Sequence, residues 1–178
     1  MSDKDSNRNI VLGGFMGTGK TTVGELIAAK LYWPFVDADA EIVSRFGKTI
    51  PEIFEQQGEG AFRRFETVIA QSLAARTRTV IATGGGMLVD PANLAMLEST
   101  GFVVCLNATP EAIEARLGDG EGRPLVWGWR DLLEDRRAVH RSRPRSASTR
   151  FSARFRSGLW KTLKIRNSEM RMETPMAS

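Results

Sequence analysis

An eight-residue segment, Gly14–Thr21, has the residue types and spacing of a loop that binds phosphate groups. It fits the pattern G-x-x-x-x-G-K-[ST]. The glycines let backbone N–H groups turn inward around a β-phosphate, and the helix expected behind them adds partial positive charge. Lys20 would reach the β- and γ-phosphates, and Thr21 would offer its hydroxyl to Mg²⁺. A plain strand-to-helix turn would explain the glycines but not Lys20 and Thr21, so we predict a nucleoside triphosphate site.

Two carboxylates, Asp37 and Asp39, follow the short apolar run Phe35–Val36. Ligands of parallel sheets bind at the carboxyl ends of the strands, where this pair is expected to lie. Residues two apart on an extended segment face the same side. One carboxylate could therefore hold Mg²⁺ through water while the other accepts the proton of an acceptor hydroxyl. The alternative is that Asp39 is only the N-cap of the following helix.

Three further segments carry groups suited to a charged ligand. Arg63 and Glu66 share a helix face, as an exposed helical ion pair also would. The run Gly84–Gly86 is predicted to end a strand, where consecutive glycines are typical of a ligand close to the backbone, although a simple loop would also contain them. Arg123 follows a glycine-spaced loop, and we predict a lid over about residues 118–127 that brings its guanidinium onto the transferred phosphate.

Strands and helices alternate along the first part of the chain, and this order positions the motifs. Strands are predicted at the apolar, β-branched runs 10–12, 35–36, 79–82 and 102–106. Helices are predicted at residues 21–31, 94–97 and 110–117. Two more are predicted between the second and third strands, one that begins at a capping box formed by Thr49 and Glu52 and a longer one that follows Gly58. This alternation predicts an α/β fold, with a parallel sheet covered by helices on both faces.

The composition is that of an ordinary globular protein. The 178 residues are 42% hydrophobic and 26% charged, which excludes collagen-like, mucin-like and wholly disordered classes. No apolar run is long enough for a membrane span, and residues 1–9 lack the apolar stretch of a secretory signal, so we expect a cytoplasmic protein. The chain has one cysteine, Cys105, and one histidine, His140, which argues against disulfides, zinc sites and serine hydrolase triads.

The net charge of +4 is unevenly distributed. Residues 1–135 contain 13 Lys and Arg against 19 Asp and Glu, a net charge of −6, whereas residues 136–178 contain 12 against 2, a net charge of +10. We therefore do not expect a nucleic-acid partner, and any argument for one from charge concerns the last quarter of the chain only. Phe151, Phe155, Leu159 and Leu163 recur every four residues there, so a basic amphipathic helix is one interpretation of the tail, and disorder is the one we favour.

Taken in order along the chain, these motifs resemble those of shikimate kinases: the phosphate loop, Asp37-x-Asp39, Phe62-Arg63-x-x-Glu66, Gly84–Gly86 and Arg123-Pro124-Leu125. The similarity covers about residues 8–125. It implies a three-layer P-loop fold of the nucleoside-monophosphate-kinase type, with a five-stranded parallel sheet flanked by helices. It also implies transfer of the γ-phosphoryl group of MgATP to the 3-hydroxyl of shikimate, a step toward chorismate and the aromatic amino acids.

The resemblance also implies roles for individual residues. Catalytic roles fall to Lys20, Asp39 and Arg123, with Asp39 as the base. Contacts with ATP fall to Gly17, Thr18, Gly19, Lys20, Thr21, Thr22 and Arg123, and contacts with Mg²⁺ to Thr21 and Asp37. Contacts with shikimate fall to Asp39, Arg63, Gly84, Gly85, Gly86 and Arg136. Arg63 would grip the substrate carboxylate, because a guanidinium fork forms two parallel charge-assisted bonds, and Arg136, or else Arg137, would be the second such arginine.

The chain departs from the family after about residue 140. Arg136–His140 still resembles the end of the lid-side helix, but no later segment matches, so the family's last strand and helix are missing or replaced. We predict a kinase domain over residues 1–140 and a basic tail over 141–178 that is disordered or non-native, as an out-of-frame reading would be. We expect a monomer. The alternatives are another small-metabolite P-loop kinase, such as a gluconate kinase, and an inactive protein that binds ATP or nucleic acid.

Overall fold

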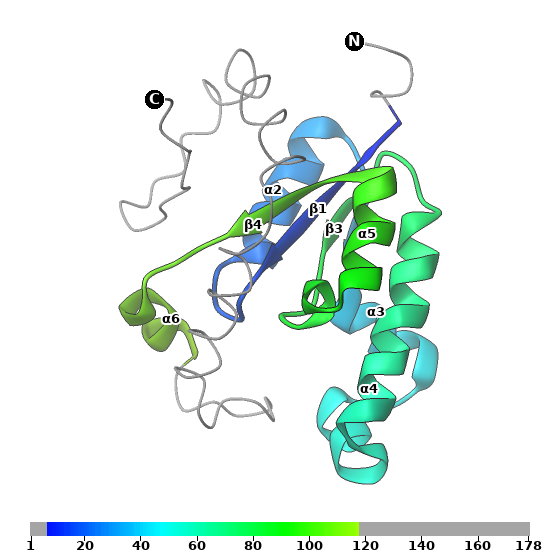
Figure 1. Cartoon of the computed structure of the whole chain (residues 1–178). Coiled ribbons are helices and arrows are strands. Elements are labelled where there is room, and N and C mark those ends of the chain that lie inside the picture. Colours follow the sequence, from blue (N-terminus) through cyan, green and yellow to red (C-terminus); the bar gives the residue numbers. More distant parts are fainter. Residues whose placement is uncertain (1–6, 118–178) are drawn as a thin grey trace.

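A four-stranded parallel sheet lies at the centre of the computed structural model, which describes residues 7–117 (Figure 1). Its strands are β1 (Asn9–Gly14), β2 (Phe35–Asp37), β3 (Val80–Ala82) and β4 (Gly101–Leu106). Their spatial order is β2-β3-β1-β4, with Ile10 of β1 in register with Val80 of β3 and with Phe102 of β4. The four strands expected from the sequence are confirmed, with ends shifted by one or two residues.

Five α-helices and one 3-10 helix accompany the sheet within the described residues. They are α2 (Lys20–Leu31), α3 (Ala38–Phe46), α4 (Ile50–Ala74), the 3-10 helix η1 (Met87–Val89), α5 (Pro91–Thr100) and α6 (Pro110–Leu117). Helix α2 covers one face of the sheet, and α3, α4 and α5 lie against the other (Figure 1). The predicted α/β architecture is therefore confirmed. Between residues 7 and 117, no helix combines the length and the hydropathy that a bilayer crossing requires.

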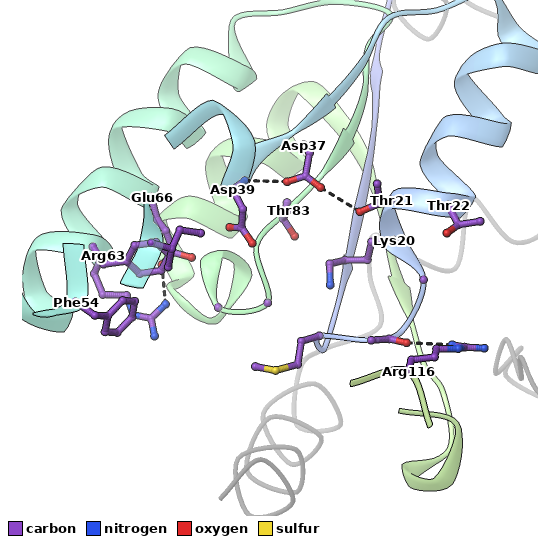
Figure 2. A pocket seen from close by; sticks show the side chains of 17 residues that line it. Lys20, Thr21, Thr22, Asp37, Asp39, Phe54, Arg63, Glu66, Thr83 and Arg116 are labelled. Carbon is purple, nitrogen blue, oxygen red and sulfur yellow. Dashed lines mark hydrogen bonds and ion pairs between the residues drawn. The ribbon is translucent and has the colours of Figure 1, made fainter. Parts of the chain in front are cut away.

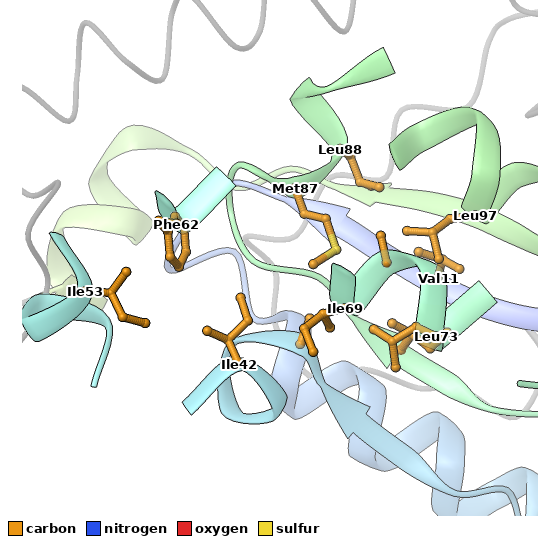
Figure 3. Close-up of a cluster of buried hydrophobic side chains, with 12 residues drawn as sticks. Val11, Ile42, Ile53, Phe62, Ile69, Leu73, Met87, Leu88 and Leu97 are labelled. Atoms are coloured by element: carbon orange, nitrogen blue, oxygen red, sulfur yellow. The ribbon is translucent and has the colours of Figure 1, made fainter. Parts of the chain in front are cut away.

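Alternate side chains of β1 supply the two halves of the hydrophobic core. Ile10 and Leu12 pack with Val23 and Ile27 of α2 on one face. Val11 points to the other face, into a cluster whose fully buried members also include Ile42, Ile53, Ile69, Leu73, Ile81, Met87 and Leu97 (Figure 3). A strand buried on both faces has no polar side to show in its sequence. This is why β1 appears there as an unbroken apolar run that leads straight into the phosphate loop.

Helix α4 begins at the predicted capping box and bends at a glycine. Thr49 Oγ1 accepts from the N–H of Glu52 at 3.4 Å, and Glu52 Oε2 accepts from the N–H of Thr49 at 2.7 Å. Gly58 has φ of 76° and ψ of 173°, a conformation that side chains disfavour. The two helical segments predicted before and after Gly58 are thus the two arms of one bent helix.

Replacing Thr49 with alanine is expected to lower the free energy of unfolding by about 0.5–2 kcal/mol, because the N–H of Glu52 loses its acceptor. Urea denaturation would measure this, and Thr49→Ser should keep most of the stability; an unchanged midpoint in Thr49→Ala would contradict it. Hydrogen bonds from Thr49 also lower the pKa of the Glu52 carboxyl. The stabilisation from ionised Glu52 is therefore complete above the ordinary pKa of a glutamate and is lost as the pH falls through the lowered folded-state pKa.

Strand β4 lies at the edge of the sheet formed by the described residues, where it pairs with β1. Several predicted features fall outside the described residues. These are the fifth strand that the family resemblance implies, the lid over about 118–127 with Arg123, the carboxylate arginine Arg136 or Arg137, and the tail 141–178.

Candidate active site

A cavity of about 520 Å³ lies at the carboxyl ends of β1, β2 and β3 (Figure 2). Its volume is in the range of small-molecule sites. The phosphate loop, the end of β2, helix α4, the loop after β3 and the end of α6 all contribute to its wall. The lining residues are Met16, Gly17, Gly19, Lys20, Thr21, Thr22, Asp37, Asp39, Ile50, Phe54, Phe62, Arg63, Glu66, Thr83, Gly85, Gly86 and Arg116. The fold therefore gathers the predicted motifs of the described residues in one place.

The phosphate loop joins β1 to α2, as its sequence pattern requires. Gly17 and Gly19 have φ of 76° and 91°, in the left-handed region where glycine is favoured. Helix α2 begins after Gly19 without a side-chain cap. Its N-terminus is consequently suited to an anion, because the first backbone N–H groups of a helix have no partner within it.

Two polar side chains of the loop hold its backbone. Lys20 Nζ donates to the carbonyl oxygens of Gly14 and Phe15, each at 2.9 Å. Thr18 Oγ1 donates to the Phe15 carbonyl at 2.7 Å and is buried, so its side chain does not line the cavity. Thr21 and Thr22 do line it. Among the loop residues predicted to contact ATP, Thr18 thus differs from the others in that its hydroxyl braces the loop.

Asp37 caps helix α3, which corrects the interpretation that Asp39 could be the cap. Asp37 Oδ1 accepts from the N–H groups of Asp39 at 3.0 Å and Ala40 at 3.3 Å. Asp37 Oδ2 accepts from Thr21 Oγ1 at 3.1 Å. Asp39 lies in the first turn of α3, so the expectation that both carboxylates share one side of an extended segment is also wrong. Both side chains nevertheless line the cavity, because α3 begins between them and its first turn lies at the cavity wall (Figure 2).

Arg63 on α4 is bonded by two carboxylates. Its Nη1 donates to Glu66 Oε2 at 2.7 Å, while its Nη2 and Nε donate to Glu59 Oε1 at 2.6 and 3.2 Å. Glu66 is only 1% exposed, so the exposed ion pair considered from the sequence is in fact half buried. Burial by itself would lower the pKa of the Arg63 guanidinium, but the hydrogen bonds and charges of Glu66 and Glu59 outweigh it and raise that pKa. The carboxylates therefore favour the charged form of Arg63.

The glycine run leaves room for two of these side chains. A Cβ on Gly84 would collide with Asp39 Oδ1 and lie 3.3 Å from Asp39 Cγ. A Cβ on Gly86 would collide with Arg63 Nη1 and lie 3.1 Å from Arg63 Cζ. Gly85 and Gly86 line the cavity. A simple loop would not need glycine at positions 84 and 86, so these two glycines are explained by the side chains that pack against them.

Seven cavity-lining residues are not among the site residues predicted from the sequence: Met16, Ile50, Phe54, Phe62, Glu66, Thr83 and Arg116. Thr83 follows β3, and its hydroxyl donates to the Leu12 carbonyl at 3.1 Å. Arg116 is in the last turn of α6, where its Nη1 donates to the Gly17 carbonyl at 3.0 Å. The contact of Arg116 spans 99 positions of sequence, so no local pattern could indicate it. Within residues 7–117 there is no cluster of three or more His, Cys, Asp or Glu side chains that could hold a metal ion.

Comparison with known proteins identifies similar chains. A family model described as Shikimate kinase matches residues 16–156, a range that continues past residue 140, where we predict the kinase domain to end. The chain is 48% identical over 126 residues to the Shikimate kinase of Geobacter sulfurreducens, covering 71% of this chain and 70% of the relative. It is 45% identical over 119 residues to that of Caldicellulosiruptor bescii, covering 67% and 69%. The solved structure of shikimate kinase from Acinetobacter baumannii in complex with shikimate has a TM-score of 0.74 at 36% identity, covering 88% of this chain and 96% of that one.

Proposed function

The chain belongs to the shikimate kinase family, and we propose on this premise that it transfers the γ-phosphoryl group of ATP to the 3-hydroxyl of shikimate. One observation supports this cavity as the site: the phosphate loop with Lys20 lines the same space as Asp39 and Arg63. A triphosphate and a hydroxylated carboxylic acid would therefore meet between them. Phosphoryl transfer demands mainly that donor and acceptor be positioned and that charge be stabilised, and these residue types supply both.

On the donor side, the phosphates of ATP bind at the loop and the start of α2. Lys20 Nζ leaves the carbonyl oxygens of the loop for phosphate oxygens, while the N–H groups around Gly17 and Gly19 surround the β-phosphate. Arg116 is a further cation beside the loop, because its guanidinium already bonds the Gly17 carbonyl. Arg123, outside the described residues, stays a prediction as the lid arginine.

Thr21 and Asp37 fit a Mg²⁺ ion bound with the nucleotide. Hydroxyl and carboxylate oxygens are ligand types that Mg²⁺ accepts, and Thr21 Oγ1 and Asp37 Oδ2 already lie 3.1 Å apart. The bound ion would neutralise charge on the β- and γ-phosphates. Because Asp37 Oδ1 is engaged by two N–H groups of α3, the carboxylate is held with its other oxygen toward Thr21.

On the acceptor side, Arg63 binds the carboxylate of shikimate and Asp39 accepts the proton of the 3-hydroxyl. Each charge-assisted bond from Arg63 is worth about 1.5–3 kcal/mol. Gly85 offers its backbone to the substrate from the loop after β3. Asp39 and Arg63 both pack against this glycine run, so the base and the carboxylate-binding group are positioned by one short loop. Arg136, outside the described residues, stays a prediction as the second carboxylate arginine.

Gly84→Ala is expected to lower kcat by about 100-fold, because the added methyl displaces the Asp39 carboxylate by roughly an ångström. The KM for ATP should change little. Gly60→Ala is the matched control, since a Cβ there would meet only Arg64 Nη1, at 3.7 Å. A kcat for Gly84→Ala equal to that of the wild type would show that turnover does not depend on the position of the Asp39 carboxylate.

A coupled assay of ADP formation, run with and without shikimate, tests the proposed reaction. ADP should appear only with shikimate, one molecule for each shikimate 3-phosphate formed, and gluconate should not replace shikimate. ADP formation without an acceptor, or no turnover at all, would contradict the proposal, and the second result would favour an inactive ATP-binding protein. The monomeric state, the cytoplasmic location and the boundary at residue 140 stay predictions.

A further inference from the structure

Every nitrogen of the Arg63 guanidinium is bonded to a carboxylate of the protein itself. Glu66 takes Nη1, and one oxygen of Glu59 takes Nη2 and Nε. A guanidinium binds a carboxylate in a two-point manner along its Nη1–Nη2 edge or its Nε–Nη2 edge. Glu59 occupies the second edge, and it shares the first with Glu66. An acid that binds Arg63 therefore meets a cation that already has partners.

The two carboxylates stand in different environments. The side chain of Glu66 is 1% exposed, whereas that of Glu59 is 59% exposed and that of Arg63 33%. The backbone of Gly86 packs against the guanidinium as well. Glu66 and Gly86 therefore fix the position of Arg63 from the buried side, and an exposed ion pair such as Glu59–Arg63 adds little to stability. Glu59 can swing into water at small cost, and Glu66 cannot.

The net charge of the Arg63, Glu59 and Glu66 group also favours the departure of Glu59 when the substrate binds. One guanidinium with two carboxylates carries a net charge of −1, and the carboxylate of the substrate would bring it to −2. Within residues 7–117, Glu59 is the partner of Arg63 that can leave without burying an unpaired charge. Its departure restores the net charge of −1 once the substrate carboxylate is in place.

We propose that the Glu59 carboxylate competes with the substrate carboxylate for Arg63. Shikimate displaces Glu59 from Arg63 when it binds, and Glu59 returns to Arg63 when the product leaves. The inference rests on the proposed function, because it takes the substrate carboxylate to bind at Arg63. The reaction leaves that carboxylate unchanged, so the phosphorylated product is held by the same guanidinium. Recapture of Arg63 by Glu59 then favours release. Glu59 acts through Arg63 and touches neither ATP nor the reacting hydroxyl.

Isothermal titration of shikimate into the full-length, nucleotide-free protein tests this proposal with Glu59→Gln. The variant removes the competing charge and is expected to bind shikimate about two- to fivefold more tightly. The KM for shikimate should fall to match, while kcat does not rise and the KM for ATP is unchanged. The gain should shrink in high salt and should be absent for shikimate methyl ester, which has no carboxylate. Glu55→Gln, the same charge change at another exposed position of α4, should leave shikimate binding unaltered.

The other outcomes separate two kinds of failure. If the wild type binds shikimate and Glu59→Gln binds it no more tightly than the wild type does, Glu59 is not a competitor and the proposed function is unaffected. Weaker binding in particular would make Glu59 a brace that holds Arg63 for the substrate. No binding of shikimate by the wild type, with or without an ATP analogue, would overturn the proposed function and this inference together.

Discussion

Replacing Asp39 with asparagine is expected to lower kcat by about 10²- to 10⁴-fold, because asparagine cannot accept the proton of the attacking hydroxyl. The amide has the shape of the carboxylate, so the packing against Gly84 should survive. ATP affinity should largely remain, since Lys20, the loop glycines and the start of α2 still provide the phosphate site. Single-turnover phosphate transfer at saturating ATP and shikimate would measure the chemical step directly.

Asp90→Asn is the matched control for this variant. Asp90 caps α5 through the N–H groups of Ala92 and Asn93, and it does not line the cavity. Asparagine is an equally good N-cap, so activity and stability should both be kept. Turnover by Asp39→Asn at the rate of the control would remove Asp39 from the chemistry and would point to another acceptor for the proton.

Arg63→Ala is expected to raise the KM for shikimate by about 10²- to 10⁴-fold, as two charge-assisted bonds of about 1.5–3 kcal/mol each are lost. The KM for ATP should stay within a few-fold of the wild type. The neighbouring Arg64 is exposed, so Arg64→Ala removes the same side chain without touching the cavity and should leave shikimate binding intact. An unchanged KM for shikimate in Arg63→Ala would mean that the carboxylate binds elsewhere.

The same change also removes one of the interactions of a buried carboxylate. Glu66 is 1% exposed, and loss of its guanidinium is expected to destabilise the fold by about 3–5 kcal/mol. Thermal unfolding should therefore accompany the kinetics. The double variant Arg63→Ala/Glu66→Gln, which also removes the buried negative charge, should recover stability but not shikimate affinity. Recovery of affinity as well would show that the effect of Arg63 is structural.

The parts of the site that could be predicted from the sequence are those with local causes. The phosphate loop needs only a strand before it, glycines within it and a helix after it, and all three are within about twenty residues. The capping box at Thr49 and Glu52 and the helix at 110–117 were equally local, and the structure has both where they were expected. The gathering of the motifs also followed from a general rule, because ligands of parallel sheets bind at the carboxyl ends of the strands.

The parts that could not be predicted depend on contacts between distant segments. Whether Asp37 or Asp39 caps α3 was decided by the residue at which the chain leaves β2, which neither spacing nor residue type indicates. The burial of Glu66 depends on how α4 packs against the loop after β3. Arg116 reaches Gly17 because α6 follows β4, the phosphate loop follows β1, and these two neighbouring strands end side by side. Contacts between segments that are far apart in the sequence leave no local pattern from which they could be predicted.

A crystal structure of the full-length protein with shikimate and a non-hydrolysable ATP analogue would show directly whether one cavity holds both substrates in reacting positions. We expect the triphosphate to lie on the loop of residues 14–21 and the shikimate carboxylate to be within hydrogen-bond distance of the Arg63 guanidinium. The 3-hydroxyl should face both Asp39 and the γ-phosphate. A shikimate carboxylate bound away from Arg63, or a 3-hydroxyl turned away from the γ-phosphate, would contradict this expectation.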